Sequence, residues 1–303
     1  MEVTARELAT GAKRGLHWPE YAIEAALLGA FMVAACSTAA LFEHPASPVH
    51  AAIPDPFIRR ALIGTAMGLT AMGLIYSPWG QRSGAHFNPS VTLTFLRLGK
   101  IETRDAVAYV AAQCVGGILG VLLAYRALGM LIAHPAVRFA ATVPGSGGAG
   151  VAFAAEFAIS FVLMSVILLI SNSRLAQCTG LACGAIVASY ITFEAPYSGM
   201  SMNPARSLAS ALVAGQWTSF WVYVCAPPLA MLAAAEFHVR VRGVDRVLCA
   251  KLNHDGPRRC IFRCRYAAPD RSRPPARAGT PEGVVPAPGH GARRLVASST
   301  QEV

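Results

Sequence analysis

Two short stretches of this sequence place an asparagine and a proline between long apolar runs. The first reads SGAHFNPS (residues 83–90) and the second reads SGMSMNPA (residues 198–205), with Arg206 directly after it. Both follow the pattern Ser-Gly-x-x-x-Asn-Pro-small. Asparagine and arginine cost free energy to bury, and proline interrupts the interior of a helix. The repeated interruption indicates one site built from both stretches.

The chemistry available to each Asn-Pro pair is hydrogen bonding at the start of a helix. Proline is favoured at the first helical position because its missing N–H would have no partner there. Asparagine is a preferred capping residue just before it. We therefore predict that Pro89 and Pro204 begin helices capped by Asn88 and Asn203. While the side-chain oxygen serves the cap, the NH₂ group can still donate into open space.

The elements that must position these residues are long and apolar. The chain is 54% hydrophobic and 14% charged, whereas a soluble domain carries about 25% charged residues. Six segments have close to the roughly 20 apolar residues that cross a bilayer. They cover residues 21–42, 61–76, 106–132, 151–170, 175–193 and 217–237. Composition and length together predict an all-α integral membrane protein rather than a soluble helical domain.

The two halves of the chain form a repeat. Residues 91–98 and 206–215 are apolar but too short to span a membrane, and each closely follows an Asn-Pro. Glu24 matches Glu156 outside the two motifs, within similar apolar segments. Each half then holds three spans and one half-helix, and this odd number of spans inverts the second half. Such inverted repeats with broken helices place a solute pathway near the membrane midplane.

The half-helices are expected to meet end to end at that midplane. Asn88 and Asn203 would lie side by side, with the positive ends of both helix dipoles pointing at them. Such a centre donates hydrogen bonds and repels cations, including hydronium.

Four regions follow from this pattern. They are an N-terminal segment (1–20), a first repeat (21–132), a second, inverted repeat (151–239) and a basic tail (240–303), which we predict to be largely disordered. The tail holds 13 of the 26 Lys and Arg residues. The positive-inside rule then puts both termini in the cytoplasm, as in a multi-pass protein of the cell (inner) membrane. The tail holds only two aromatic residues among its basic ones, Phe262 and Tyr266, so no nucleic-acid partner is predicted.

The stretches SGAHFNPSVTL and SGMSMNPARS resemble the two signature loops of the aquaporin (major intrinsic protein) family, here a bacterial-type member. The resemblance covers about residues 21–237. It implies six tilted helices, two re-entrant half-helices, a pore in each subunit and a homotetramer in the lipid membrane. It also implies that Asn88 and Asn203 orient a single file of water and that Arg206 lines the outer constriction.

Further site residues come from the same resemblance. The paired motifs map to Asn88, Pro89, Ser90, Asn203, Pro204 and Ala205. Glu24 and Glu156 match family glutamates that accept hydrogen bonds from the broken loops, and His86 matches the histidine of the first loop. Ser90 departs from the usual alanine; it is small enough to be tolerated, and its hydroxyl is expected to contact the backbone.

The resemblance places four residues at the constriction: Met67, Ile191, Met200 and Arg206, with Gly68 as an alternative to Met67. Strict water channels have histidine where Ile191 stands. Glycerol channels have aspartate where Ser207 stands. The first departure argues against a strict water channel, and the second argues against a glycerol channel. Ala211 and the aromatic pair Phe220-Trp221 also resemble the water-channel class, so we expect water as the main permeant. Small neutral solutes, namely glycerol, hydrogen peroxide, ammonia and metalloid acids, are possible further permeants. The alternative is a glycerol or metalloid facilitator rather than a water channel.

Other functions are less favoured by the residues. An ion-coupled transporter needs ionisable groups at mid-span, and only Glu24 and Glu156 qualify. A further alternative is a non-conducting structural membrane protein whose pore is blocked by Met67 and Met200. The chain shows no nucleophile–base set and no phosphate loop, so no enzyme and no cofactor are predicted.

The tail holds a last set of candidate ligands: Cys249, His254, Cys260 and Cys264. Three thiols and an imidazole suit a zinc ion, although their spacing matches no standard zinc finger. The alternative is a set of reduced cytosolic thiols on a juxtamembrane segment whose arginines contact anionic lipid headgroups.

Overall fold

The structure, a computed structural model, describes residues 15–254 and 259–266. Most of the predicted N-terminal segment and the Pro- and Arg-rich part of the tail (residues 271–294) therefore lie outside the described residues.

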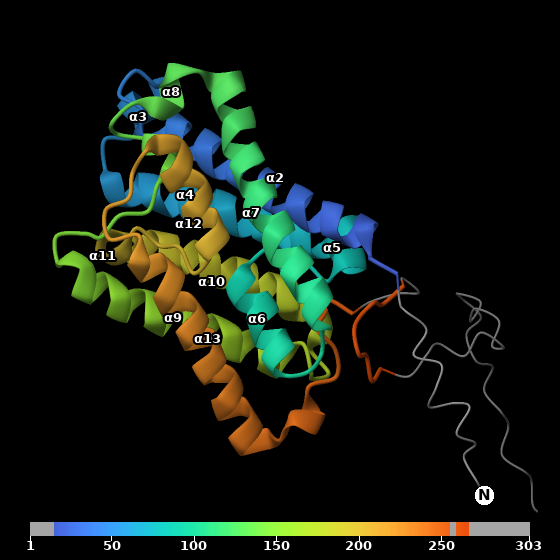
Figure 1. Ribbon diagram of the computed structural model, residues 1–303. Helices are drawn as coiled ribbons and strands as arrows, with labels where there is room; N and C mark the ends of the chain where they lie inside the picture. Colours follow the sequence, from blue (N-terminus) through green and yellow to red (C-terminus); the bar gives the residue numbers. More distant parts are fainter. Residues whose placement is uncertain (1–14, 255–258, 267–303) are drawn as a thin grey trace, which may run out of the picture. The chain divides into compact units, whose positions relative to one another are not determined.

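Six long helices form the body of the described chain (Figure 1). They are α2 (Trp18–Glu43), α4 (Pro56–Tyr76), α7 (Thr103–Leu128), α9 (Gly148–Ile170), α10 (Thr179–Phe193) and α13 (Trp221–Arg242). All six are long and apolar enough to cross a membrane when α10 is taken with the preceding turn η2 (Ala176–Cys178). The described residues contain no β-strand. The predicted all-α architecture with six spans is thus confirmed.

The third span ends earlier than its apolar run. At Gly129 the backbone turns with φ 58°, and a separate short helix, α8 (Met130–Ala133), follows. Glycine takes this left-handed conformation at no steric cost.

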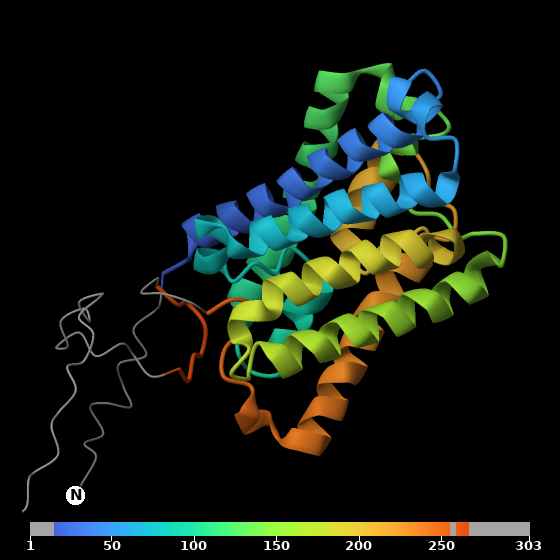
Figure 2. The ribbon, with the colours of Figure 1, turned by 180° about the vertical axis from the view of Figure 1, so that it is seen from behind.

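Two half-helices begin at the two Asn-Pro pairs. α6 (Pro89–Arg97) packs on α7 and α13, and α12 (Pro204–Ala214) packs mainly on α7. Figure 1 shows both beside α7 and α13, and Figure 2, seen from behind, shows α2, α4, α9 and α10 in front of them. The remaining elements are short: α3 (Pro48–Ala52), α5 (Pro78–Ser83), η1 (Arg138–Ala140), α11 (Ala195–Ser198) and η3 (Val244–Arg246).

Helix pairing follows the repeat. α2 packs along α7 and its counterpart α9 packs along α13, while α4 packs along its own counterpart α10. Glycines make the last contact close: a Cβ on Gly68 would lie 2.4 Å from the Gly184 carbonyl oxygen, and a Cβ on Gly184 would lie 2.6 Å from that of Gly68. Small residues permit such backbone approach in membranes, where packing drives association. The contact joins the two halves at equivalent points.

Part of the tail packs against one end of the bundle. We call residues 247–254 and 259–266 the tail segment. The Leu252 N–H donates to the Gly84 carbonyl (3.1 Å), and the Arg263 N–H donates to the Lys100 carbonyl (2.9 Å). Phe262 is buried among these contacts. This part of a tail that was expected to be largely disordered is therefore docked, because it carries apolar side chains that the bundle covers.

Candidate functional site

The two asparagines cap their own helices and hold each other's loops. Asn88 Oδ1 accepts the Ser90 N–H (2.8 Å), and Asn203 Oδ1 accepts the N–H groups of Ala205 (3.1 Å) and Arg206 (3.2 Å). The Asn88 amide donates to the Met202 carbonyl (2.8 Å). In return, the Asn203 amide donates to the carbonyl of the residue before Asn88 (2.7 Å). The two half-helices therefore start back to back and are cross-linked by their capping residues.

Glu24 supports the first loop. Its carboxylate accepts the Ser83 hydroxyl (2.7 Å) and the N–H groups of His86 (3.1 Å) and Phe87 (2.6 Å). The amide of Gln113 adds a further bond to it (2.8 Å). A carboxylate is acceptor-only, so it can satisfy several loop donors that face one point.

Glu156 supports the second loop in the same way. It accepts the Ser198 hydroxyl (2.8 Å) and the N–H groups of Ser201 (2.6 Å) and Met202 (2.8 Å). Both glutamates are fully buried. The two glutamates thus support their loops through equivalent sets of bonds, as their matching places in the repeat predict.

These bonds hold a strained backbone. Ala85 and Phe87 have φ values of 56° and 28°, and Met200 and Met202 have 51° and 55°. Non-glycine residues in this left-handed region cost of order 1–3 kcal/mol each and persist only where the surroundings enforce them. The strain turns successive N–H groups of each loop toward its glutamate.

Two tyrosines complete the loop supports and were not among the predicted site residues. The Tyr109 hydroxyl donates to the Ser83 carbonyl (2.7 Å), and the Tyr223 hydroxyl donates to the Ser198 carbonyl (2.5 Å). The signal was present in the sequence, because both tyrosines occupy the same place in the repeated stretches YVAA and YVCA.

A cavity of about 410 Å³ runs beside the two loops. Asn88, Asn203 and Arg206 line it, and most of its other lining residues are apolar. The Nη1 atom of Arg206 is buried without a hydrogen-bond partner among the described residues. Unpaired buried donors are costly, so this guanidinium is available to a molecule in the cavity.

The four residues predicted for the constriction all line this cavity. Met67, Ile191 and Met200 line it together with Arg206. Gly68, the alternative to Met67, instead faces α10 at the close contact with Gly184. Of the two alternatives on α4, Met67 is therefore the one that lines the cavity.

His86 lies near the end of the cavity that the tail segment covers. Its ring lies between those of Phe95 and Phe262, at centroid distances of 5.2 and 5.4 Å, and its Nε2–H donates to the Ala250 carbonyl (2.8 Å). Leu252 also lines the cavity. The tail segment thus borders one end of the cavity. The sequence analysis did not predict that residues of the tail would line it.

Ser90 is fully buried, as its small size allows. Its hydroxyl has no hydrogen-bond partner among the described residues. The expected contact with the backbone is therefore wrong. A serine hydroxyl near the start of a helix would bond to the carbonyl three or four residues before it, and the Phe87 carbonyl already accepts from the Asn203 amide (2.7 Å).

The four candidate ligands of the tail come together at one point. Their donor atoms all lie within 4.8 Å of one another. The hydrogen bond from Cys249 lowers the pKa of the Cys260 thiol, and the donation raises the pKa of Cys249 itself.

Comparison with known proteins agrees with this architecture. Aquaporin NIP1-3 of Oryza sativa subsp. japonica is 38% identical over 183 residues, which cover 60% of this chain and 62% of that protein. Aquaporin NIP1-1 of Zea mays is 37% identical over 188 residues, covering 61% of this chain and 64% of that protein. The chain thus matches somewhat less than two thirds of the length of these relatives.

A solved structure gives the same fold. The aquaglyceroporin from Plasmodium falciparum superimposes with a TM-score of 0.64 over 75% of this chain and 98% of that chain, at 20% sequence identity. The family described as major intrinsic protein matches residues 20–238 of this sequence. The chain belongs to the major intrinsic protein family.

Proposed function

We propose that this protein is a passive transmembrane channel that conducts water and small neutral solutes and excludes protons and ions. The observation that carries the proposal is the pair of cross-bonded asparagines at the meeting point of two half-helices, on the wall of a cavity. Each amide uses one hydrogen in the cross-bond and has a second to offer a passing water.

Charge exclusion follows from the same geometry. The N-termini of α6 and α12 carry the positive ends of their dipoles to the centre of the cavity wall. Arg206 adds a full positive charge beside them. Partial and full positive charges on a narrow, largely apolar path raise the energy of a passing cation, whereas a neutral solute is unaffected.

The side chains that line the cavity indicate which class of solute the channel conducts. Ile191 contributes no hydrogen-bonding group to the constriction, and Met67 and Met200 contribute only flexible, weakly accepting thioethers. This favours water with small neutral solutes such as glycerol, hydrogen peroxide, ammonia or metalloid acids. The names of the relatives, aquaporins and an aquaglyceroporin, support the same class. Family members of this type are channels rather than enzymes, and no enzymatic activity is proposed.

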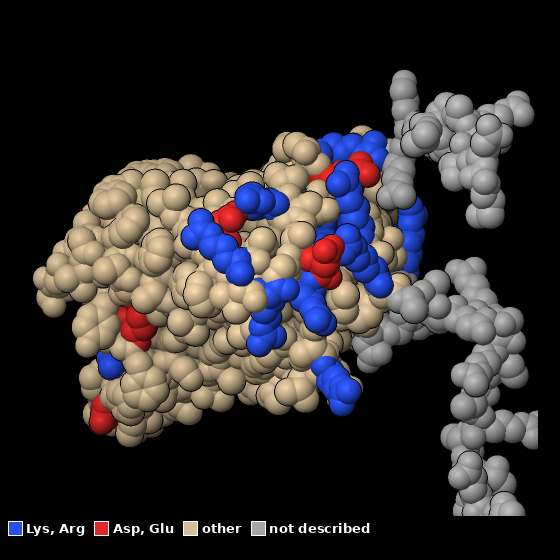
Figure 3. Space-filling model, turned by 90° about the horizontal axis from the view of Figure 1, so that it is seen from below, with Lys and Arg blue, Asp and Glu red and all other residues tan. Residues whose placement is uncertain are grey.

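Membrane orientation is proposed from the charges. Figure 3 shows Lys and Arg side chains gathered toward one end of the molecule, with few at the other. Arg97 ends α6, Lys100 contacts the tail segment and Arg240 lies in the last turn of α13. The positive-inside rule supports a cytoplasmic location for this end and for both termini. We further propose the cell (inner) membrane, contact with its lipids and a homotetramer with one pore per subunit.

Stopped-flow light scattering on proteoliposomes tests the function. Under an osmotic gradient of an impermeant solute, we expect shrinkage faster than in empty liposomes, and a subsequent glycerol gradient reports the second solute. Fast glycerol equilibration with slow water flow would favour a glycerol or metalloid facilitator. Shrinkage no faster than in empty liposomes for either gradient would favour a non-conducting structural protein.

A further inference from the structure

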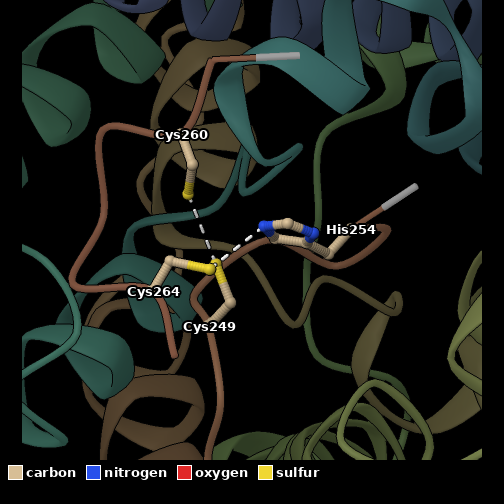
Figure 4. A group of neighbouring side chains, drawn as sticks. All are labelled: Cys249, His254, Cys260 and Cys264. Carbon is tan, nitrogen blue, oxygen red and sulfur yellow. Dashed lines mark hydrogen bonds between the residues drawn. The ribbon is translucent and has the colours of Figure 1, made fainter. Parts of the chain in front are cut away.

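Three thiols and one imidazole converge in the tail segment. Figure 4 shows the side chains of Cys249, His254, Cys260 and Cys264 pointing toward a common centre. The Cys249 and Cys260 Sγ atoms are 3.5 Å apart, and the Cys264 Sγ lies 3.1 Å from the His254 Nε2. All four donor atoms lie within 4.8 Å of one another.

This geometry is close to that of a tetrahedral zinc site. Zn–S bonds of about 2.3 Å and Zn–N bonds of about 2.0–2.1 Å place the donors of a tetrahedron about 3.5–3.8 Å apart. Small side-chain adjustments would bring the present distances into that range. Three thiolates and one histidine also form a donor set typical of structural zinc. We propose that these four side chains bind one zinc ion, on the described part of the tail.

The surroundings favour such a site. A zinc ion with three thiolates carries a net charge of −1. Lys100 is buried beside the cluster, and the ammonium of Lys251 is held nearby by the Arg259 carbonyl (3.0 Å). The His254 ring stacks on Tyr266 at 4.4 Å, and the Tyr266 hydroxyl donates to the Ser171 carbonyl at the end of α9 (2.7 Å). Such outer contacts orient a ligating histidine.

A disulfide between Cys249 and Cys260 is the competing use of two of these thiols. It would leave His254 and Cys264 without a role, although both point to the same centre as the other two. It would also require an oxidising compartment, whereas the proposed cytoplasmic location keeps thiols reduced. Zinc accounts for all four side chains.

The ion would fasten the tail segment over one end of the cavity. The segment reaches the first loop through three contacts: the Ala250 carbonyl accepts from His86, the Leu252 N–H donates to Gly84, and Phe262 stacks on His86. Its ligands lie on both sides of these contacts in the sequence, at 249 and 254 and at 260 and 264. Where a small segment forms its zinc site only when it folds, the free energy of zinc binding adds to the free energy of folding of that segment. Metal binding therefore stabilises the segment in its docked position.

Metal analysis of the purified full chain tests the proposal without reference to permeation. The protein is reduced, incubated with ZnSO₄, passed through a desalting column and measured by inductively coupled plasma mass spectrometry. We expect about one zinc per chain for the unmodified protein. We expect Cys264→Ser to weaken binding by more than the roughly 10–100-fold that loss of an outer-shell partner costs.

Cys225→Ser is the matched control, because Cys225 is exposed on α13; it should keep the zinc. A Co²⁺-loaded sample should show the strong visible absorption of a tetrahedral thiolate complex, which a protein that does not fold would lack. A reduced, folded chain that retains no zinc would overturn the proposal. So would equal zinc content in Cys264→Ser and Cys225→Ser, which would place any bound zinc elsewhere.

Hydrogen–deuterium exchange tests whether zinc holds the tail segment in its docked position. Zinc should slow exchange of the amides of Leu252 and Arg263, which donate to the bundle. The same comparison in Cys264→Ser should show no effect of zinc. Equal exchange with and without bound zinc would refute the fastening of the segment by the ion.

Discussion

Glu24 and Glu156 bind their loops through equivalent sets of bonds: one serine hydroxyl and two consecutive backbone N–H groups each. One difference separates them. Glu24 also accepts from Gln113, whose counterpart in the repeated stretch is Pro227, a residue without a side-chain donor. The first loop therefore has one more support within the bundle, in addition to the tail segment.

Replacing either glutamate by glutamine should destabilise the protein strongly. A glutamine keeps one oxygen but turns an NH₂ group toward N–H donors that need an acceptor. Hydrogen bonds to a charged group contribute about 1.5–3 kcal/mol each, so we expect a loss of several kcal/mol for Glu156→Gln. Thermal unfolding in detergent measures it. Glu236→Gln, at a more exposed pair with Arg97, is the control and should change little; equal unfolding midpoints for the two variants would contradict a supporting role of Glu156.

Ser90→Ala should stabilise the protein or leave its stability unchanged. The buried Ser90 hydroxyl has no partner among the described residues, and removing an unsatisfied polar group recovers about 1 kcal/mol or more. Ser83→Ala provides the contrast, because it removes a hydroxyl that donates to Glu24. The unfolding midpoint should rise or stay the same for the first variant and fall for the second. A fall for Ser90→Ala comparable to that for Ser83→Ala would reveal a partner of this hydroxyl.

Arg206→Val should admit larger or cationic solutes. The guanidinium lies on the cavity with one unpaired nitrogen, and its loss both widens the path and removes a positive charge. Proteoliposome fluxes of glycerol and of a small organic cation measure the change. Arg126→Val, at an exposed position near the end of α7, should keep the original selectivity. Identical flux ratios in the two variants would exclude Arg206 from the constriction.

Gly68→Ala should weaken the contact between α4 and α10. The added Cβ would lie 2.4 Å from the Gly184 carbonyl oxygen, and overpacking of this kind costs about 1–3 kcal/mol. Gly73→Ala on the same helix meets nothing within 4 Å, so the better helix propensity of alanine should raise stability there by up to about 1 kcal/mol. Opposite shifts of the two unfolding midpoints are the expected result, and shifts of the same sign would contradict the close contact.

Removal of zinc should open one end of the cavity. Leu252 lines that end, and its segment would lose its fastening when a chelator strips the proposed ion. We expect faster osmotic shrinkage of proteoliposomes after chelation, and no response to the chelator in Cys264→Ser. Unchanged permeability in a chain shown to have lost its zinc would mean that the segment does not obstruct the path.

Much of the fold could be predicted because the two halves of the sequence repeat the same pattern. The repeated Asn-Pro pairs, the matched glutamates and the six apolar lengths each indicated an element that the structure contains. The choice between Met67 and Gly68 needed the structure, since it depends on which face of α4 meets the glycine of α10. The docking of the tail segment was also not predictable, because Leu252 and Phe262 contact residues 168 and 176 positions earlier, Gly84 and His86.

Of the two loops, the first is the one that the tail segment contacts among the described residues, so two equivalent loops have unlike surroundings at the two ends of the cavity. A substitution in either loop alters one of two equivalent sets of contacts that meet at the asparagine pair. The tail segment has no counterpart on the second loop among the described contacts. Substitutions in it would therefore change access to the cavity from one side of the membrane and leave the paired loops as they are.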